Sequence, residues 1–98
     1  MKELLKKFPH VSEINQVLGV YEIFVNGLDH TLKVKIVKHL ASGSCMGIAN
    51  LEVKKKNGLQ FTRSLHTMDT PEAALEDALD GFFKVFGEGA EVREVKGW

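Results

Sequence analysis

Residues 70–87, TPEAALEDALDGFFKVFG, decide the fold, because they carry a helix with its own start and stop signals. Thr70 is a favoured N-cap residue, Pro71 suits the first helical position, and Gly87 is typical of the residue just past a helix end. The apolar residues between them recur at helical spacing: Ala74, Leu75, Ala78, Leu79, Phe82, Phe83 and Phe86. The pattern predicts an amphipathic helix over 70–86 that supplies much of the core through Leu75, Leu79, Phe82 and Phe86.

Upstream of this helix, the apolar period changes to that of a β-strand. Residues 20–25 and 31–37 alternate apolar and polar side chains around Asn26-Gly27, which is a strong hairpin signal. Leu28-Asp29 lengthens the connection and favours a bulged or four-residue turn. Two more alternating runs, 45–54 and 59–66, surround a second Asn-Gly pair. We therefore expect two hairpins that form a four-stranded antiparallel meander over residues 20–66.

The two ends of the chain have shorter patterns. Leu4, Leu5 and Phe8 form the apolar edge of a first helical turn, which Pro9 interrupts. Ser12 fits the N-cap of a second short helix over Glu13–Leu18.

Together the pieces predict a single α+β domain over residues 1–98. Short helices lie in 1–18, an antiparallel sheet in 20–66, and the helix 70–86 packs on one sheet face. Residues 88–98 form either a tail or a fifth, edge strand.

The composition excludes several classes of protein. The chain has 98 residues, of which 44% are hydrophobic and 27% charged, as in an ordinary globular domain. Lys+Arg and Asp+Glu are 13 each, which argues against a general binder of polyanions. No apolar run approaches the roughly 18 residues of a membrane span, and the N-terminus lacks a signal-peptide pattern. We expect a cytoplasmic protein with no membrane partner.

Charge is unevenly distributed along the chain. Residues 1–67 hold ten Lys/Arg and five Asp/Glu, a net +5, whereas residues 68–98 hold three and eight, a net −5. If the helix covers one sheet face, Lys33 and Lys35 project from the other, open face, and residues 54–56 add three lysines. This pattern fits either a nucleic-acid or anion-binding surface or a solvated face that resists edge pairing. Only Phe24 lies beside these lysines, whereas a stacking platform uses two or three aromatic residues, so nucleic acid is the less favoured partner.

The same open face carries apolar side chains. Phe24, Val37, Met46 and Ile48 alternate out of phase with the core positions and could form an apolar patch there. Such a patch favours a homodimer through the sheet, or a ligand groove. We therefore predict a non-catalytic binding or assembly module that self-associates through the open sheet face, with anion or nucleic-acid binding as the alternative.

Local motifs for catalysis, metals or cofactors are absent from the sequence. The four histidines, at positions 10, 30, 39 and 66, show no metal-ligand spacing, so we expect no metal site and no cofactor. Cys45, the single cysteine, alternates with Gly47 and Ala49 and is expected to be buried. An enzyme built around Cys45 and His66 stays open as a third reading.

One polar cluster stands out near the end of the last alternating run. Arg63, Ser64 and His66 provide a cation, a hydroxyl and an imidazole within four residues. Such a set can orient a small anion, so these residues are candidate ligand-binding groups together with Lys33 and Lys35.

Two protein families share parts of this pattern. The order helix, antiparallel meander, helix resembles the double-stranded RNA-binding domain, whose second helix opens with phosphate-gripping lysines. Here that helix opens with Asp69, Thr70, Pro71 and Glu72, and four strands are expected where the family has three. Residues 69–78 also look like the strand-to-helix junction of HicB-type antitoxins. Neither resemblance covers enough of the chain to carry a function over.

Overall fold

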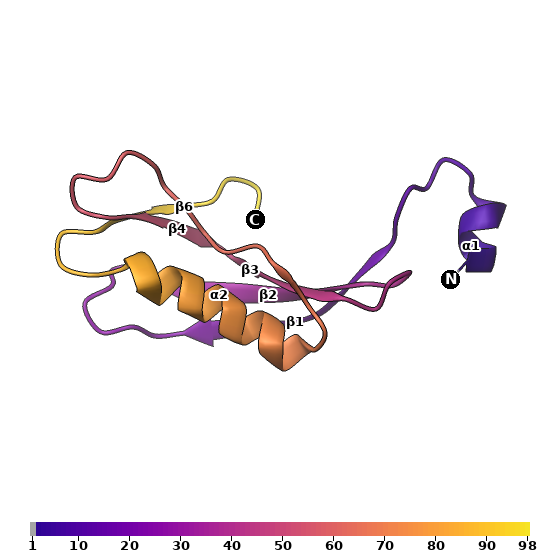
Figure 1. Ribbon diagram of the computed structural model, residues 1–98, viewed down its shortest axis with the longest axis horizontal. Helices are drawn as coiled ribbons and strands as arrows, with labels where there is room; N and C mark the ends of the chain where they lie inside the picture. The colour runs from indigo at the N-terminus through magenta and orange to yellow at the C-terminus, as the bar shows by residue number, and fades with distance from the viewer. Residues whose placement is uncertain (1) are drawn as a thin grey trace.

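A computed structural model describes residues 2–98 and shows an α+β body with an N-terminal arm standing away from it (Figure 1). Met1, the first residue of the expected helical segment, lies outside the described residues. The elements in chain order are α1 (Lys2–Lys7), β1 (Asn15–Ile23), β2 (Leu32–His39), β3 (Cys45–Ala49), β4 (Leu51–Lys54), β5 (Thr67–Met68), α2 (Pro71–Val85) and β6 (Glu91–Glu94). The predicted fold class, an antiparallel sheet with a C-terminal helix, is confirmed.

The main sheet has four antiparallel strands in the order β1-β2-β3-β5, and β4 pairs with β6 in a separate two-stranded ladder. The first hairpin lies where Asn26-Gly27 predicts it. Leu28 donates its backbone N–H to the Val25 carbonyl at 3.2 Å, and Gly27 takes a φ of 81° that suits glycine. The connection from Phe24 to Thr31 is longer than the expected four-residue turn.

Asn50 divides the predicted run 45–54 between the two sheets. Its side-chain Oδ1 accepts the Lys33 backbone N–H at 2.7 Å, and its Nδ2 donates to the Thr31 carbonyl at 3.1 Å. The Asn50 carbonyl accepts the Val95 N–H at 2.8 Å. The Asn50 side chain thus bonds to backbone groups at the start of β2, while the Asn50 carbonyl bonds to the segment that follows β6.

Helix α2 covers one face of the main sheet, as predicted (Figure 1). The Thr70 hydroxyl caps it by accepting the Ala73 N–H at 3.1 Å. The fully buried stripe consists of Ala74, Ala78 and Phe82, whereas the expected core residues Leu75, Leu79 and Phe86 are only partly buried. The helix therefore approaches the sheet most closely at Ala74 and Ala78, whose side chains are small.

Gly47 in β3 explains why small residues face the sheet. A Cβ atom built on Gly47 would overlap the carbonyl oxygen of Ala74 and lie 3.1 Å from the Cβ of Ala78. Helix and strand backbones are thus in direct contact. Cys45, Gly47 and Ala49 face the helix, and Cys45 is 2% exposed, as its alternation predicts.

The short helix expected over Glu13–Leu18 is wrong, because Asn15–Leu18 belong to β1. Val17 lies opposite Val37 of β2, and a bulge follows between Val17 and Gly19. The spacing of Ile14, Val17 and Leu18 suited one face of a helix, but so short a helix gains little without packing, whereas the long strand β2 offers a full ladder.

The expected strand over 59–66 is mostly irregular. Gly58 closes the predicted turn by donating to the Lys55 carbonyl at 2.8 Å, but only an isolated bridge between Val53 and Thr62 follows. The fourth strand of the sheet is instead the two-residue β5. The edge strand considered for the C-terminal segment exists as β6, although it pairs with β4 rather than with the main sheet.

Within residues 2–98, no helix combines the length and the apolar character needed to cross a membrane.

Gly47→Ala should destabilise the protein by about 1–3 kcal/mol, because the added methyl group must push α2 away from β3. Urea unfolding followed by circular dichroism would measure the change. Gly87→Ala is the control, since a Cβ there meets nothing within 4 Å, and its effect should stay within about 0.5 kcal/mol. Equal midpoints for both variants would contradict the close helix–strand contact.

Candidate functional site

The face of the main sheet opposite α2 carries an apolar strip. The strand register places Val17, Val37 and Met46 side by side in one row, and Val20, Lys35 and Ile48 in the next. Val17 is 56% exposed and Val20 is 51% exposed, so neither is covered by the rest of the chain. We call Val17, Val20, Val37, Met46 and Ile48 the open-face strip.

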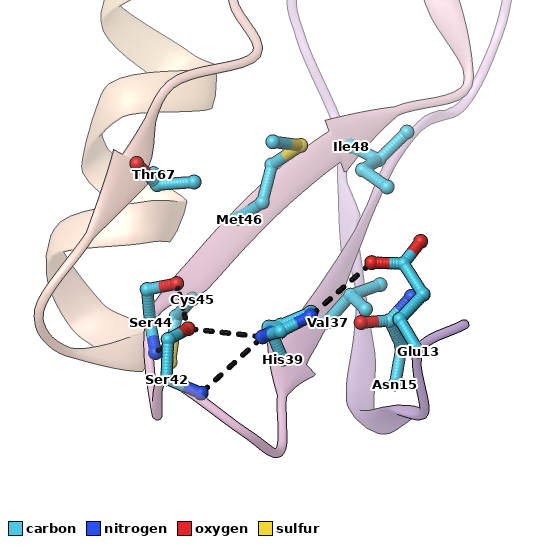
Figure 2. A pocket seen from close by; sticks show the side chains of 10 residues that line it. All are labelled: Glu13, Asn15, Val37, His39, Ser42, Ser44, Cys45, Met46, Ile48 and Thr67. Atoms are coloured by element: carbon cyan, nitrogen blue, oxygen red, sulfur yellow. Dashed lines mark hydrogen bonds and ion pairs between the residues drawn. The ribbon is translucent and has the colours of Figure 1, made fainter. Parts of the chain in front are cut away.

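A groove of about 390 Å³ lies on this face at the end where β2 finishes and β3 begins (Figure 2). Its apolar floor contains Val37, Met46 and Ile48, three of the four predicted interface residues. The fourth, Phe24, lies beyond the end of β1 and is 82% exposed, outside the groove. The remaining lining residues are Glu13, Asn15, His39, Ser42, Ser44, Cys45 and Thr67.

A chain of polar side chains forms one rim of this groove (Figure 2). Glu13 Oε2 lies 3.2 Å from His39 Nε2, and His39 Nδ1 lies 3.0 Å from the Ser42 hydroxyl. Ser42 in turn contacts the Ser44 hydroxyl at 2.8 Å. No local motif in the sequence indicates this rim. Recognising Asn15 as a strand residue would have revealed it, because Asn15 pairs with His39 and brings Glu13 near.

Glu13, His39 and Ser42 supply a carboxylate, an imidazole and a hydroxyl in the order that can activate a serine nucleophile. The neighbouring backbone N–H groups, however, already have hydrogen-bond partners within the chain. The Gly43 N–H bonds to the His39 carbonyl at 2.7 Å, and the Ser44 N–H bonds to the Ser42 hydroxyl oxygen at 3.3 Å. Acyl transfer needs such donors to stabilise a developing oxyanion. The geometry therefore fits a hydrogen-bonded border of the groove better than a catalytic centre.

The residues of the predicted ligand cluster, Arg63, Ser64 and His66, bind two different parts of the same chain. Arg63 donates from Nη1 to the Ala49 carbonyl at 2.9 Å. Ser64 donates to Asp77 Oδ2 at 2.9 Å, and His66 Nδ1 lies 3.0 Å from Asp77 Oδ1. A carboxylate at the centre of this cluster disfavours an anionic ligand. Arg63 instead ties the irregular segment before β5 to β3, and Ser64 and His66 tie it to helix α2.

The contacts with Ser64 and His66 also change the pKa of the Asp77 carboxyl group. Partial burial by itself would raise the pKa of its carboxyl group. The hydrogen bonds from Ser64 and His66, with the positive charge of His66, outweigh burial and lower that pKa below its ordinary value of 3.8.

Two of the predicted basic residues, Lys35 and Lys54, are engaged by groups of the same chain. Lys35 Nζ donates to the Trp98 carbonyl at 2.7 Å and lies 5.0 Å from the centre of the indole ring. Trp98 Nε1 also donates to the Ile48 carbonyl at 2.7 Å, so the C-terminal residue is fastened to β3. Lys33 lies opposite Glu22 in the strand register, and Lys54 Nζ is 2.6 Å from Glu91.

The Cys45 thiol lies 4.0 Å from the Gly43 carbonyl, and the His66 ring is bound to Ser64 and Asp77. Over the part of the chain that the structure describes, no group of three or more His, Cys, Asp or Glu side chains could hold a metal ion.

Comparison of the chain with protein-family models, curated proteins and solved structures finds no match.

The lowered pKa of Asp77 gives a prediction for acid stability. A carboxyl group whose pKa is lower in the folded state stabilises the fold above its unfolded pKa, and that contribution is lost as the pH falls through the folded pKa. Wild type should therefore lose stability below pH 3.8 more steeply than Asp77→Asn. Urea unfolding between pH 2.5 and 6 measures this, with Asp80→Asn, an exposed position on α2, as the control. Parallel curves for wild type and Asp77→Asn would contradict the contact.

Proposed function

We propose that this protein is a non-catalytic assembly module that forms a homodimer through its open sheet face. The observation that carries the proposal is the open-face strip, which lies on a four-stranded sheet whose opposite face is already covered by α2. Val17 and Val20 are half exposed and share this face with the partly exposed Val37, Met46 and Ile48. Such neighbouring apolar side chains gain free energy when a second surface removes them from water.

The charges around the strip support a second copy as the partner. The open face carries both signs, with Glu22 opposite Lys33 at one end and Glu13 beside His39 at the other. Identical faces of this kind do not repel each other as two uniformly basic faces would. Because the partner has the same charges, a two-fold axis through the interface satisfies both copies equally.

The alternative, binding of nucleic acid or another anion, has less support. It relies on Lys33, Lys35 and residues 54–56, but Lys35 and Lys54 already bind Trp98 and Glu91. Phosphate contacts need lysines that are free to exchange their counterions for the ligand.

A cytoplasmic location goes with this proposal. The chain's one cysteine is buried and makes no disulfide, which is typical of proteins in reducing compartments.

Met46→Lys should convert the dimer to a monomer, because it places a charge in the middle of the apolar groove floor. Sedimentation equilibrium over micromolar to millimolar concentrations would measure a weakening of about tenfold or more. Leu59→Lys is the matched control, since Leu59 is 97% exposed and lies outside the strip. A wild-type protein that stays monomeric throughout this range would refute the proposal.

A further inference from the structure

We propose that the N-terminal arm, residues 2–11, occupies the open-face groove of the partner copy, so that two chains exchange arms. This inference rests on the proposed dimer and names the segment that fills its groove.

The arm presents apolar side chains to water. Leu4 is 42% exposed, Phe8 is 48% exposed and Val11 is 39% exposed. Leu4 and Phe8 are four residues apart, and the Phe8 N–H donates to the Leu4 carbonyl at 3.1 Å, so they lie on one side of the helical turn. A six-residue helix such as α1 has little stability in water, and an apolar contact surface would supply what it lacks.

The arm extends away from its own body (Figure 1). The radius of gyration is 15.6 Å, whereas a compact domain of this length has about 13 Å. The longest dimension of the molecule is 51 Å against 24 and 18 Å for the others. Such a projecting segment is typical of elements that pack on another chain.

A turn at Pro9 sets the direction of the arm. The Val11 N–H donates to the Phe8 carbonyl at 2.9 Å, which closes a turn with proline at its favoured second position. The arm is then anchored at Ile14, whose carbonyl accepts the Leu40 N–H at 3.1 Å. Because Pro9 fixes its own φ and restricts Phe8, this turn limits the angles that α1 can take to the segment leading into β1.

The groove and the arm are complementary in chemistry. The groove has an apolar floor of Val37, Met46 and Ile48, which suits side chains such as Leu4 and Phe8. Its rim carries the carboxylate of Glu13, and the arm carries lysines at positions 6 and 7. Glu13 is also at the root of the arm, so each arm leaves the body beside a groove of this kind.

The first test compares oligomeric state in variants of the full chain. Leu4→Ser and Phe8→Ser should each weaken the dimer about tenfold or more in sedimentation equilibrium, with unchanged far-ultraviolet circular dichroism from the sheet and α2. Leu59→Ser, which alters an exposed leucine outside both arm and groove, should leave the dimer intact. A dimer that survives both arm variants but is lost in Met46→Lys overturns the arm exchange and leaves the proposed function standing. A monomeric wild type refutes both.

The second test asks whether the contact is between chains. In a Cys45→Ala background, Phe8→Cys protein labelled with ¹⁵N is mixed with unlabelled Met46→Cys protein and treated with a short bifunctional thiol reagent. Mass spectrometry should find the peptide containing position 8, in its labelled form, joined to the peptide containing position 46, in its unlabelled form. The Leu59→Cys variant in place of Phe8→Cys should not give this product. A cross-link formed only within one chain of a Phe8→Cys/Met46→Cys double variant would show that the arm fills its own groove and would overturn the proposal.

Discussion

The backbone contact between α2 and β3 is the constraint on which the rest of this structure depends. At Gly47 the strand has no side chain, and the Ala74 carbonyl occupies the space that a Cβ would need. This contact fixes the distance of the helix from the sheet and selects alanines at the closest positions of α2. It also fixes which face of β3 is buried, since the strand alternates. Cys45 and Ala49 therefore join the core, and Met46 and Ile48 are left on the open face.

A second close contact holds the other side of the helix. A Cβ built on Gly81 would overlap the Cβ of Ser64, and Ser64 and His66 both bind Asp77 one helical turn earlier. Ser64 and His66 thus pack against α2, where a regular strand would have to follow the sheet. These contacts explain why the alternating pattern over 59–66 produced only the isolated bridge at Thr62. The polar cluster that the sequence suggested as an anion site is part of this attachment.

Elements with local signals were predictable from the sequence, and elements that depend on distant partners were not. Helix α2 followed from its cap at Thr70 and its apolar period, and the first hairpin followed from Asn26-Gly27. The start of β1 could not be seen, because the spacing of Ile14, Val17 and Leu18 suits one face of a helix and only pairing with β2 makes the segment a strand. The same limit hid the polar rim of the groove, since Glu13 and His39 meet only through that pairing. Val37, Met46 and Ile48 were identifiable as groove residues because strand alternation alone assigns them to one face.

The core has two layers, the main sheet and α2, so one face of the sheet is left without a helix over it. A sheet with apolar side chains on both faces needs cover on both, and residues 2–98 contain only one long helix, which the Gly47 contact commits to one face. The other face keeps Val17 and Val20 half exposed, while Phe8 of the arm is equally exposed at a distance from the body. Both surfaces are unsatisfied within a single copy, and a short helix gains stability only from packing. In the dimer that we propose, a symmetric pair of chains would supply the missing layer for each sheet without any additional element, and the exposed arm and the open face would form two halves of one contact.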